Sequence, residues 1–543
     1  MNLRMGWLDI SIWLILLSPT LARQNASHPG SVPSPQTGAG EKNQSVALPT
    51  AKEELLGELS PQTDVPGPAI AKRGWKEFLI DPYAVEHGTD YFADSASLRF
   101  AVPAKQGKRW VLVVDGKEKD VFDGIESVLV SPGGQHVVFS AKRDEKWVKM
   151  LDDRELGPAF DELGRGFWFW GEAELRHYAY AAKRGKKWLV IADGKEGPEY
   201  EEVGRPVFNA DGHHLAYRAK NTKNREFIVL DGKEEAEFEE VSAPHFSPDG
   251  QHLAYRAKTA KRHETIVLDV KEGPQFEKVS RPHFSPDGKR IAYIASRGKR
   301  KIKQRDSEFY FVPQVVVLDG NEGPEFEEVR NPVFSPDGQH LAYQGKRATF
   351  DGHKDVLILD GTEKADFEYA GGLPIFSPDS QHIAYVGWEK GSLVGFLDGK
   401  RLDGAKSPGA WRDVAFTEEI NFSPDSQRLA YVVGWGGQAY LEGRTTRAHR
   451  CVVVDGHVGE DYDTLGIDMG FSPDNRHFIY TVRGGVSENK STVVIDGQKG
   501  KLYDDVIGGA FREVANASDS PPQAFVYVAR DGRKFYRVTQ PLP

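Results

Sequence analysis

The stretch Phe246–Tyr255, with the sequence FSPDGQHLAY, recurs almost unchanged at Phe334–Tyr343 and decides the fold of this 543-residue chain. Near-copies share its turn residues and its final apolar strand, and they begin at Val130, Phe208, Phe284, Phe376, Phe422 and Phe471. From Phe208 onward, successive copies begin 38, 38, 50, 42, 46 and 49 residues apart. A period of about 40 residues, with turn signals and short alternating strands, is typical of the blades of a β-propeller.

Residues 198–232 illustrate how one repeat is expected to fold. We expect four short strands in it, at Pro198–Val203, Arg205–Phe208, His214–Lys220 and Glu226–Leu230. The segments Asn209–Gly212 and Asp231-Gly232 separate or end these strands. Because Gly tolerates positive φ and Asp bonds nearby backbone amides, both segments favour tight hairpin turns. The repeat therefore predicts an all-β fold built from four-stranded blades.

The number of repeats exceeds that of ordinary propellers. We count about eleven four-stranded units, whereas most propellers have about four to eight blades. We therefore expect two propellers in series, with about five blades in residues 76–278 and about six in residues 279–543. One large ring is the alternative.

The two ends of the repeat region are expected to meet. An early strand-like run, Asp81–Glu86, precedes the first inner strands, and Gly509–Gln540 holds three strand-like runs with no fourth after them. A strand near the N-terminus can complete this last blade, and closing the ring in this way removes exposed sheet edges.

The first 75 residues read as an export signal followed by a linker. We expect a signal peptide at 1–22, because the eight-residue apolar run Ile10–Leu17 is followed by small residues. Such a run is too short to cross a bilayer as a helix, so we expect no transmembrane anchor. Residues 23–75, rich in Ser, Pro and Gly, are expected to form a flexible linker, with a short helix considered around Ala51–Leu59. The protein is thus expected to be exported, and either periplasmic or secreted.

Charge and cysteine content exclude some classes of function. The chain has 80 acidic and 70 basic residues and a net charge of −10, which argues against a nucleic-acid partner. Cys451 is the single cysteine, so no intramolecular disulfide can form. Because Cys451 directly precedes the run Val452–Val454, we expect it to be a buried strand residue rather than a nucleophile.

The FSPDG repeat, over roughly residues 80–540, resembles the TolB-type, WD-repeat-like family of β-propellers. The resemblance rests on Ser-Pro-Asp-Gly followed, in one register, by an apolar-Ala-Tyr strand. It implies an exported, non-catalytic binding platform. The chain departs from the family in its number of units and in an added segment of the type VVxDGKEGPEFEEV, so the family's own partners are not carried over.

No motif in the sequence indicates catalysis. A GxSxG elbow, an HExxH pair, a phosphate-binding Gly-rich Lys loop and a CxxC pair are all absent, so we expect no catalytic residue, no metal ligand and no cofactor. Six histidines occupy one repeat position just before the Ala-Tyr strand, where other repeats carry Arg290 or Arg428. We interpret these six as structural: His136, His214, His252, His340, His382 and His477.

His245 and His283 are different, because both precede the first Phe of consecutive repeats. We expect them to lie side by side on inner strands. They support an alternative function, that of a lyase or hydrolase acting on acidic polysaccharides, in which they would line a pocket together with lysines. The acid pairs of segments such as Pro198–Val203 recur in most repeats, which favours solvated edge charges over a glycosidase pair.

The loops after the Ala-Tyr strands are basic and vary in length, as in AKRGKKW at 182–188 and SRGKRKIKQR at 296–305. Insertions in repeat proteins cluster on one face, which often binds a partner. The predicted partner-binding residues share these loops, and they are Lys105, Lys142, Lys183, Lys220, Lys258, Arg300, Lys301, Lys346 and Arg347.

The same loops lead to a prediction about charge. We expect lysines and arginines on one face, and the acids on the opposite face and at the outer edge. Trp110, Trp147 and Trp188 begin the strands after three of these loops and are expected to pack mainly in the core. The sequence thus predicts a protein or anionic polymer as the partner of the basic face.

Overall fold

The computed structural model describes strands and turns, and no helix occurs in the described part of the chain. The described residues are 48–58, 63–64, 93–94, 99–115, 117–131, 135–164, 167–170, 176–261, 263–304, 307–349, 352–389, 392–402, 420–435, 449–462, 464–485, 488–513, 523–532 and 534–543. The expected signal peptide at 1–22 and the expected early strand at Asp81–Glu86 lie outside them. Accordingly, this part of the chain contains no helix that could cross a membrane.

Eleven blades surround one axis, numbered here in chain order. Blade 1 comprises β2 (Thr63–Asp64), β3 (Ala93–Asp94), β4 (Arg99–Gln106), β5 (Arg109–Val114) and β6 (Lys117–Phe122), and blade 2 comprises β7 (Gly124–Val130), β8 (Val137–Arg143), β9 (Lys146–Leu151) and β10 (Arg154–Glu155). Blade 3 comprises β11 (Glu162–Leu163), β12 (Trp168–Trp170), β13 (His177–Arg184), β14 (Lys187–Ala192) and β15 (Lys195–Glu196). Blade 4 comprises β16 (Glu202–Val203), β17 (Val207–Phe208), β18 (Leu215–Lys220), β19 (Glu226–Leu230) and β20 (Lys233–Glu234).

Blade 5 comprises β21 (Glu240–Val241), β22 (His245–Phe246), β23 (Leu253–Lys258), β24 (Glu264–Leu268) and β25 (Lys271–Glu272). Blade 6 comprises β26 (Lys278–Val279), β27 (His283–Phe284), β28 (Ile291–Ser296), β31 (Gln314–Leu318) and β32 (Asn321–Glu322), with a separate hairpin of β29 (Arg300–Gln304) and β30 (Ser307–Phe311). Blade 7 comprises β33 (Glu328–Phe334), β34 (Leu341–Thr349), β35 (Gly352–Leu359) and β36 (Thr362–Phe367).

Blade 8 comprises β37 (Tyr369–Phe376), β38 (Ile383–Glu389), β39 (Ser392–Leu397) and β40 (Lys400–Arg401), and blade 9 comprises β41 (Ile420–Phe422), β42 (Leu429–Trp435), β43 (His449–Val454) and β44 (His457–Tyr462). Blade 10 comprises β45 (Thr464–Phe471), β46 (Phe478–Gly485), β47 (Glu488–Ile495) and β48 (Gln498–Lys499). Blade 11 comprises β49 (Asp505–Glu513), β50 (Gln523–Asp531) and β51 (Lys534–Pro541), and it is completed by β1 (Lys52–Glu58).

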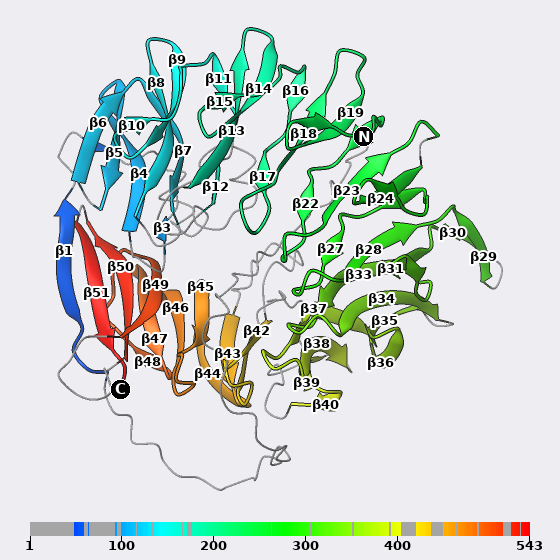
Figure 1. Cartoon of the computed structure of the whole chain (residues 1–543). Coiled ribbons are helices and arrows are strands. Elements are labelled where there is room, and N and C mark those ends of the chain that lie inside the picture. The colour runs from blue at the N-terminus through cyan, green and yellow to red at the C-terminus, as the bar shows by residue number, and fades with distance from the viewer. Residues whose placement is uncertain are drawn as a thin grey trace, which may run out of the picture.

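The blades form one ring, which is the alternative raised by the sequence and not the expected pair of propellers. The chain passes once around the axis, and the last blade lies beside the first (Figure 1). The expected boundary between residues 278 and 279 has no counterpart, because one core cluster unites Ala254 and Ile266 of blade 5 with Val279 and Tyr293 of blade 6. Equivalent repeats bury equivalent faces, so nothing interrupts the stacking at this point.

Ring closure follows the expected scheme with a different strand. The N-terminal strand β1 pairs antiparallel with β51 and forms the outer strand of blade 11. It comes from within the expected linker, at the place where a short helix was considered, so that helix is wrong. The reason is visible in the sequence, since Lys52-Glu53-Glu54 repeats the Lys-Glu start of other outer strands, such as Lys233-Glu234.

Each blade has four strands, but the inner and the outer strand differ from those assigned from the sequence. In blade 4, β16 and β17 both pair with β18, so they are two halves of one inner strand. The outer strand is β20, which the sequence-based assignment missed. The acidic-aromatic segment at Ala236–Val241 is therefore a crossing from the outer strand of one blade to the inner strand of the next.

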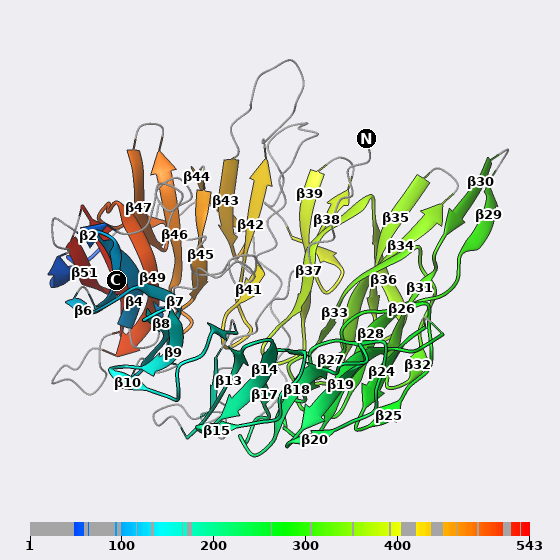
Figure 2. The same ribbon diagram turned by 90° about the horizontal axis from the view of Figure 1, so that it is seen from above.

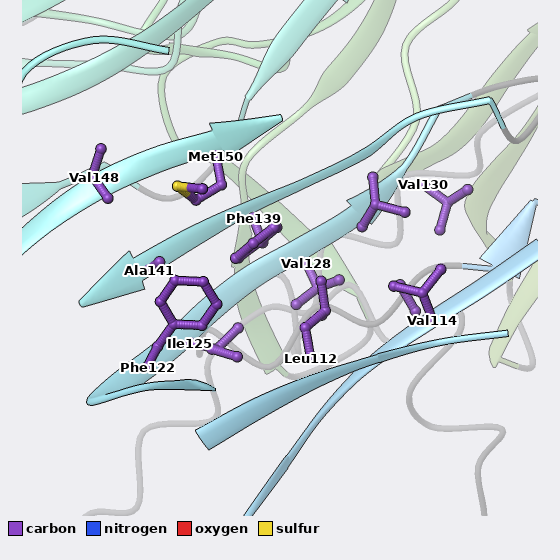
Figure 3. Packing of buried hydrophobic residues seen from close by; sticks show 12 residues of the cluster. Leu112, Val114, Phe122, Ile125, Val128, Val130, Phe139, Ala141, Val148 and Met150 are labelled. Atoms are coloured by element: carbon purple, nitrogen blue, oxygen red, sulfur yellow. The ribbon is translucent and has the colours of Figure 1, made fainter. Parts of the chain in front are cut away.

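Aromatic residues at these crossings hold neighbouring blades together. Phe238 is 5% exposed and makes an edge-to-face contact with Tyr255 of blade 5, at 6.4 Å between ring centroids. Figure 3 shows the equivalent layer between blades 1 and 2, where Phe122 and Leu112 face Phe139 and Met150. The core is thus a series of apolar layers between successive sheets, as expected of a propeller.

Two kinds of turn recur at one end of the blades. The Asp-Gly turn joins the third and outer strands, and both of its residues have positive φ, as at Asp231 (50°) and Gly232 (78°). This conformation defines the type I′ hairpin turn, which explains the recurrent Asp-Gly pair. The Ser-Pro-Asp-Gly turn joins the inner and second strands at the same end, here called the turn face. The loops between the second and third strands lie at the opposite end, here called the loop face.

Candidate functional site: the loop face and the inner edge of the ring

Polar side chains on the turn face are engaged within the ring. His214 Nδ1 lies 2.7 Å from Asp231 Oδ2, and Asp231 Oδ1 accepts a hydrogen bond from the Leu215 amide at 2.9 Å. The same His–Asp pair recurs at His136–Asp152, His177–Asp193, His252–Asp269, His340–Asp360, His382–Asp398 and His477–Asp496. Arg290 and Arg428 take the histidine's place on Asp319 and Asp455. The structural role predicted for the six histidines is confirmed.

The aspartates of the Ser-Pro-Asp-Gly turns are also engaged. Ser247 Oγ donates to Asp249 Oδ1 at 2.5 Å, and this hydrogen bond lowers the pKa of Asp249. The Asp249 carboxylate lies against Gly288 of the next turn, where an added Cβ would come within 2.3 Å of it. Only glycine fits beside Asp249, so these two turns interlock. On the turn face, the His and Asp side chains described above are hydrogen-bonded within the ring.

The loop face carries the predicted lysines at equivalent positions. Each lies near the end of a second strand, opposite the start of the third, and the cross-strand pairs are Lys105–Trp110, Lys142–Trp147, Lys183–Trp188, Lys220–Glu226, Lys258–Glu264 and Lys346–Asp355. Lys105 and Lys183 stack over their tryptophans, at 5.1 and 5.3 Å from the ring centroids. The three tryptophans are half-buried, and Trp110 packs on the core.

The predicted separation of charges is wrong, because acids accompany these lysines on the same face. Lys183 Nζ lies 2.7 Å from Glu162 Oε2, and Lys142 Nζ lies 3.0 Å from Glu145 Oε2. The cause is topological: the acidic crossing segments enter each blade at the loop end, so Glu162 becomes the cross-strand neighbour of Lys183. The loop face is therefore a surface of alternating charge.

The remaining predicted residues lie in the longer loops. Arg300 begins β29 and pairs with Glu325 at 2.5 Å, and Arg347 near the end of β34 pairs with Glu363 at 2.7 Å. Lys301 is the second residue of β29 and is the cross-strand partner of Tyr310. The structure thus groups these residues on one face with the five lysines, while their role in binding stays a prediction.

The hairpin β29–β30 projects from the loop face. It forms its own two-stranded sheet, and it extends beyond the blades on the side to which β34–β35 and β46–β47 also rise (Figure 2). The nine sequence positions 297–305 include six basic residues, and three of these, Arg300, Lys301 and Lys303, lie on β29. Tyr310 on its second strand is 67% exposed. An exposed aromatic residue beside cations is common in protein interfaces.

Sequence reasoning missed a set of buried and half-buried polar side chains that link neighbouring blades between blades 4 and 8. Glu226 is nearly buried and accepts a hydrogen bond at 3.0 Å from the Val241 amide of the next blade. Glu264, Gln314 and Asp355 do the same for the amides of Val279, Val329 and Ala370. A polar residue at the start of an otherwise apolar third strand was the available signal, and it marks a link between blades rather than a binding site.

His245 and His283 lie side by side, as predicted, on the inner strands of blades 5 and 6. Their equivalent cross-strand partners are Ala254 and Ala292. Burial, and then the nearby charges of Arg281 and His283, lower the pKa of His245 to about 4. Within the described residues, no group of three His, Cys, Asp or Glu side chains is arranged to hold a metal ion.

Comparison with solved structures finds other β-propellers. The chain is 15% identical to the β-propeller domain of the Trilobed protease from Pyrococcus furiosus, over 54% of this chain and 93% of that one, with a TM-score of 0.25. It is 14% identical to TolB from Acinetobacter baumannii, over 56% of this chain and 78% of that one, with a TM-score of 0.21. It is 12% identical to the tricorn protease, over 77% of this chain and 48% of that one, with a TM-score of 0.26. The blades around one axis show by themselves that the chain is a β-propeller.

No family model matches the sequence, and no curated protein matches it. At these identities and TM-scores, the solved structures transfer neither a site nor an activity to this chain.

Proposed function

We propose that this propeller is an exported, non-catalytic binding platform that engages a protein partner through its loop face. The supporting observation is the difference between the two faces. Short interlocked turns with internally bonded side chains form one face, whereas the longer hairpins, including β29–β30, project from the other. Variable loops on a rigid scaffold are the usual place for recognition.

The charge pattern favours a protein over an anionic polymer. Glu145 and Glu162 lie beside Lys142 and Lys183, so a uniform polyanion would meet repulsion as well as attraction along the face. A protein surface can present both signs of charge in register. The basic hairpin β29–β30 is the segment where cations outnumber acids, and it would meet an acidic patch of the partner.

The rival activity, cleavage of acidic polysaccharides, needs two acids converging on one bond. The acids on the loop face recur once per blade junction, as at Glu162, Glu202 and Glu240, and this spacing supports binding instead. A screen with uronate polymers and divalent metal ions distinguishes the two. Turnover that disappears in His283→Ala would favour the enzyme and contradict this proposal.

The binding role is tested by reversing charge on the hairpin. We expect K301E/K303E to weaken salt-sensitive binding to the partner recovered by cross-linking from envelope extract, because two cations facing an acidic patch become anions. K233E/K271E is the matched control, since it makes the same charge change on exposed outer strands next to the turn face. Equal losses in both variants would overturn the hairpin's role. Strong retention of the wild type on alginate or heparin would instead indicate a polymer.

The export part of the proposal rests on the apolar run Ile10–Leu17. Expression of the full chain in a bacterial host, followed by fractionation, tests it. We expect mature protein that begins after Ala22 in the periplasm or medium. An uncleaved N-terminus in the cytoplasmic fraction would contradict it.

A further inference from the structure

The inner edge of the ring at blades 4 to 6 carries cations at equivalent positions. Arg205 and Arg281 each precede the proline of their inner strands, and Ala243 occupies the same position on the blade between them. His245 lies two residues after Ala243, and His283 lies two residues after Arg281. Arg205, Ala243, Arg281 and His283 are all exposed, so this part of the edge is open to solvent.

Arg281 differs from most arginines of the ring. Arg184, Arg218, Arg256, Arg290, Arg330 and Arg428 each pair with an acid. The guanidinium of Arg281 has no hydrogen-bond or ion-pair partner among the described residues, and its charge lowers the pKa of His245. A cation that lies beside imidazoles rather than beside a carboxylate raises the local potential without compensation.

His245 adds a second unsatisfied group. Its Nε2 is buried and has no hydrogen-bond partner, and leaving a buried polar atom unpaired is costly. Burial and the neighbouring charges lower the pKa of His245 to about 4, so its imidazole is neutral at pH 7. A carboxylate brought to Arg281 would cancel the repulsion and allow His245 to take up a proton.

We propose that Arg281, with His245 and His283, forms a carboxylate-binding site for an extended acidic peptide lying along the inner edge of blades 4 to 6. A carboxylate matches the planar guanidinium through two parallel hydrogen bonds. Arg205 supplies a second cation, one blade-width beyond Ala243. A ligand that reaches both arginines must span a blade, which a chain of acidic residues does and a single inorganic anion does not. This site is distinct from the hairpin β29–β30.

The proposal predicts binding of a labelled hexaglutamate peptide, measured by fluorescence anisotropy on the full chain at low ionic strength, with hexaglutamine as the neutral control peptide. Arg281→Gln should weaken binding about tenfold or more, because it removes a charge-assisted pair with a carboxylate. Lys261→Gln removes one exposed cation from the loop between β23 and β24 of the neighbouring blade 5, and it should leave the affinity nearly unchanged. Equal effects of the two variants, or no binding by the wild type, would overturn the site.

Protonation gives a second readout. Binding should tighten as the pH is lowered from about 7 to about 5, because a bound carboxylate raises the pKa of His245 and binding then takes up a proton. His245→Phe keeps a buried ring and should flatten this pH dependence while retaining binding at pH 7. An unchanged pH profile in His245→Phe would remove His245 from the site. Inorganic phosphate that competes as well as the peptide would contradict the peptide and leave a simple anion site.

Discussion

At the scale of single residues, the ring is specified by short-range polar chemistry that recurs in blades 2 to 10. The His–Asp pair, which joins the start of the second strand to the Asp-Gly turn, illustrates this. Asp231 binds both the His214 side chain and the Leu215 backbone amide. That Arg290 performs the same role on Asp319 explains why the position tolerates either residue. The sequence predicted this role because the alternatives at one repeat position share only their ability to donate a hydrogen bond.

Not every Asp-Gly turn keeps its glycine. Val270 occupies the place of glycine in the Asp-Gly turn of blade 5, with φ of 69°, and its side chain is 59% exposed. A left-handed conformation costs an L-residue about 1–2 kcal/mol, and β-branched residues adopt it least readily. This turn is therefore strained.

Val270→Gly should stabilise the protein by about 0.5–1 kcal/mol, after allowance for the greater freedom of glycine in the unfolded chain. A rise in the midpoint of urea unfolding measures the gain. Val458→Gly is the matched control, because Val458 is 52% exposed on β44 without positive φ, and there the same substitution should destabilise. A lower midpoint for Val270→Gly would contradict the assigned strain.

At the scale of elements, the acidic-aromatic segments changed meaning between sequence and structure. The sequence shows a short run such as Ala236–Val241 with strand-like composition, and it was interpreted as a strand with solvated acids. In the structure its Phe238 leaves the outer strand of one blade, and its Val241 enters the inner strand of the next. The pattern of residue types does not reveal such a crossing, because both of its halves are extended.

The same ambiguity misplaced the charges of the candidate site. The sequence identified the basic loops and their common face, because strand directions alternate and insertions cluster there. It could not place the acids, since that depends on which end of the blade the crossing reaches. Glu162 lies beside Lys183 only because the chain enters each blade at the loop face.

Truncating a crossing aromatic tests its role as a link between blades. Phe238→Ala should cost about 3–5 kcal/mol, because it leaves a cavity between Ile228 and Tyr255 in an apolar layer. Chemical unfolding followed by tryptophan fluorescence measures the change. Leu502→Ala alters a 44% exposed residue of another crossing segment and should have an effect within about 0.5 kcal/mol. Similar costs for both variants would argue against a specific link.

At the scale of the whole molecule, the repeats build a single ring because every blade presents the same two faces. The sequence predicted the blade type, the approximate count and closure by the N-terminal region. It did not decide between one ring and two, since the angle between adjacent blades depends on packing such as that of Tyr293 and Val279, and small differences accumulate around the ring. The closing strand was missed because Lys52–Glu58 carries more leucine and glutamate than other strands.

Closure depends on a polar cluster at Glu53. Glu53 accepts hydrogen bonds from Lys501 at 2.8 Å and from the Tyr503 hydroxyl, both at the entry to blade 11. Burial pushes the pKa of Glu53 upward, but these hydrogen bonds outweigh it and leave the pKa below its usual value of 4.5. A lowered carboxyl pKa stabilises the fold above 4.5, and the contribution is lost as the pH falls through the lowered value. The raised pKa of Lys501 keeps its own contribution until the pH exceeds 10.5.

Glu53→Gln should therefore destabilise the ring at pH 7, by about 1 kcal/mol or less because the cluster is partly exposed. The difference in thermal midpoint between wild type and variant should shrink as the pH falls below 4.5 and Glu53 takes up a proton. Glu54→Gln is the control, since Glu54 meets Arg537 at 3.4 Å on the exposed side of β1. A gap that stays constant with pH would contradict the assignment.

Pairing of β1 with β51 also sets the order of folding. The ribosome makes β1 long before β51, so the ring can close only after β51 has been synthesised. Until then β51 would be a bare edge, open to neighbouring chains at high concentration. Refolding of the full chain should accordingly show a slow, late step. A truncated protein that lacks residues 1–58 should not show this step, and its soluble yield should be lower.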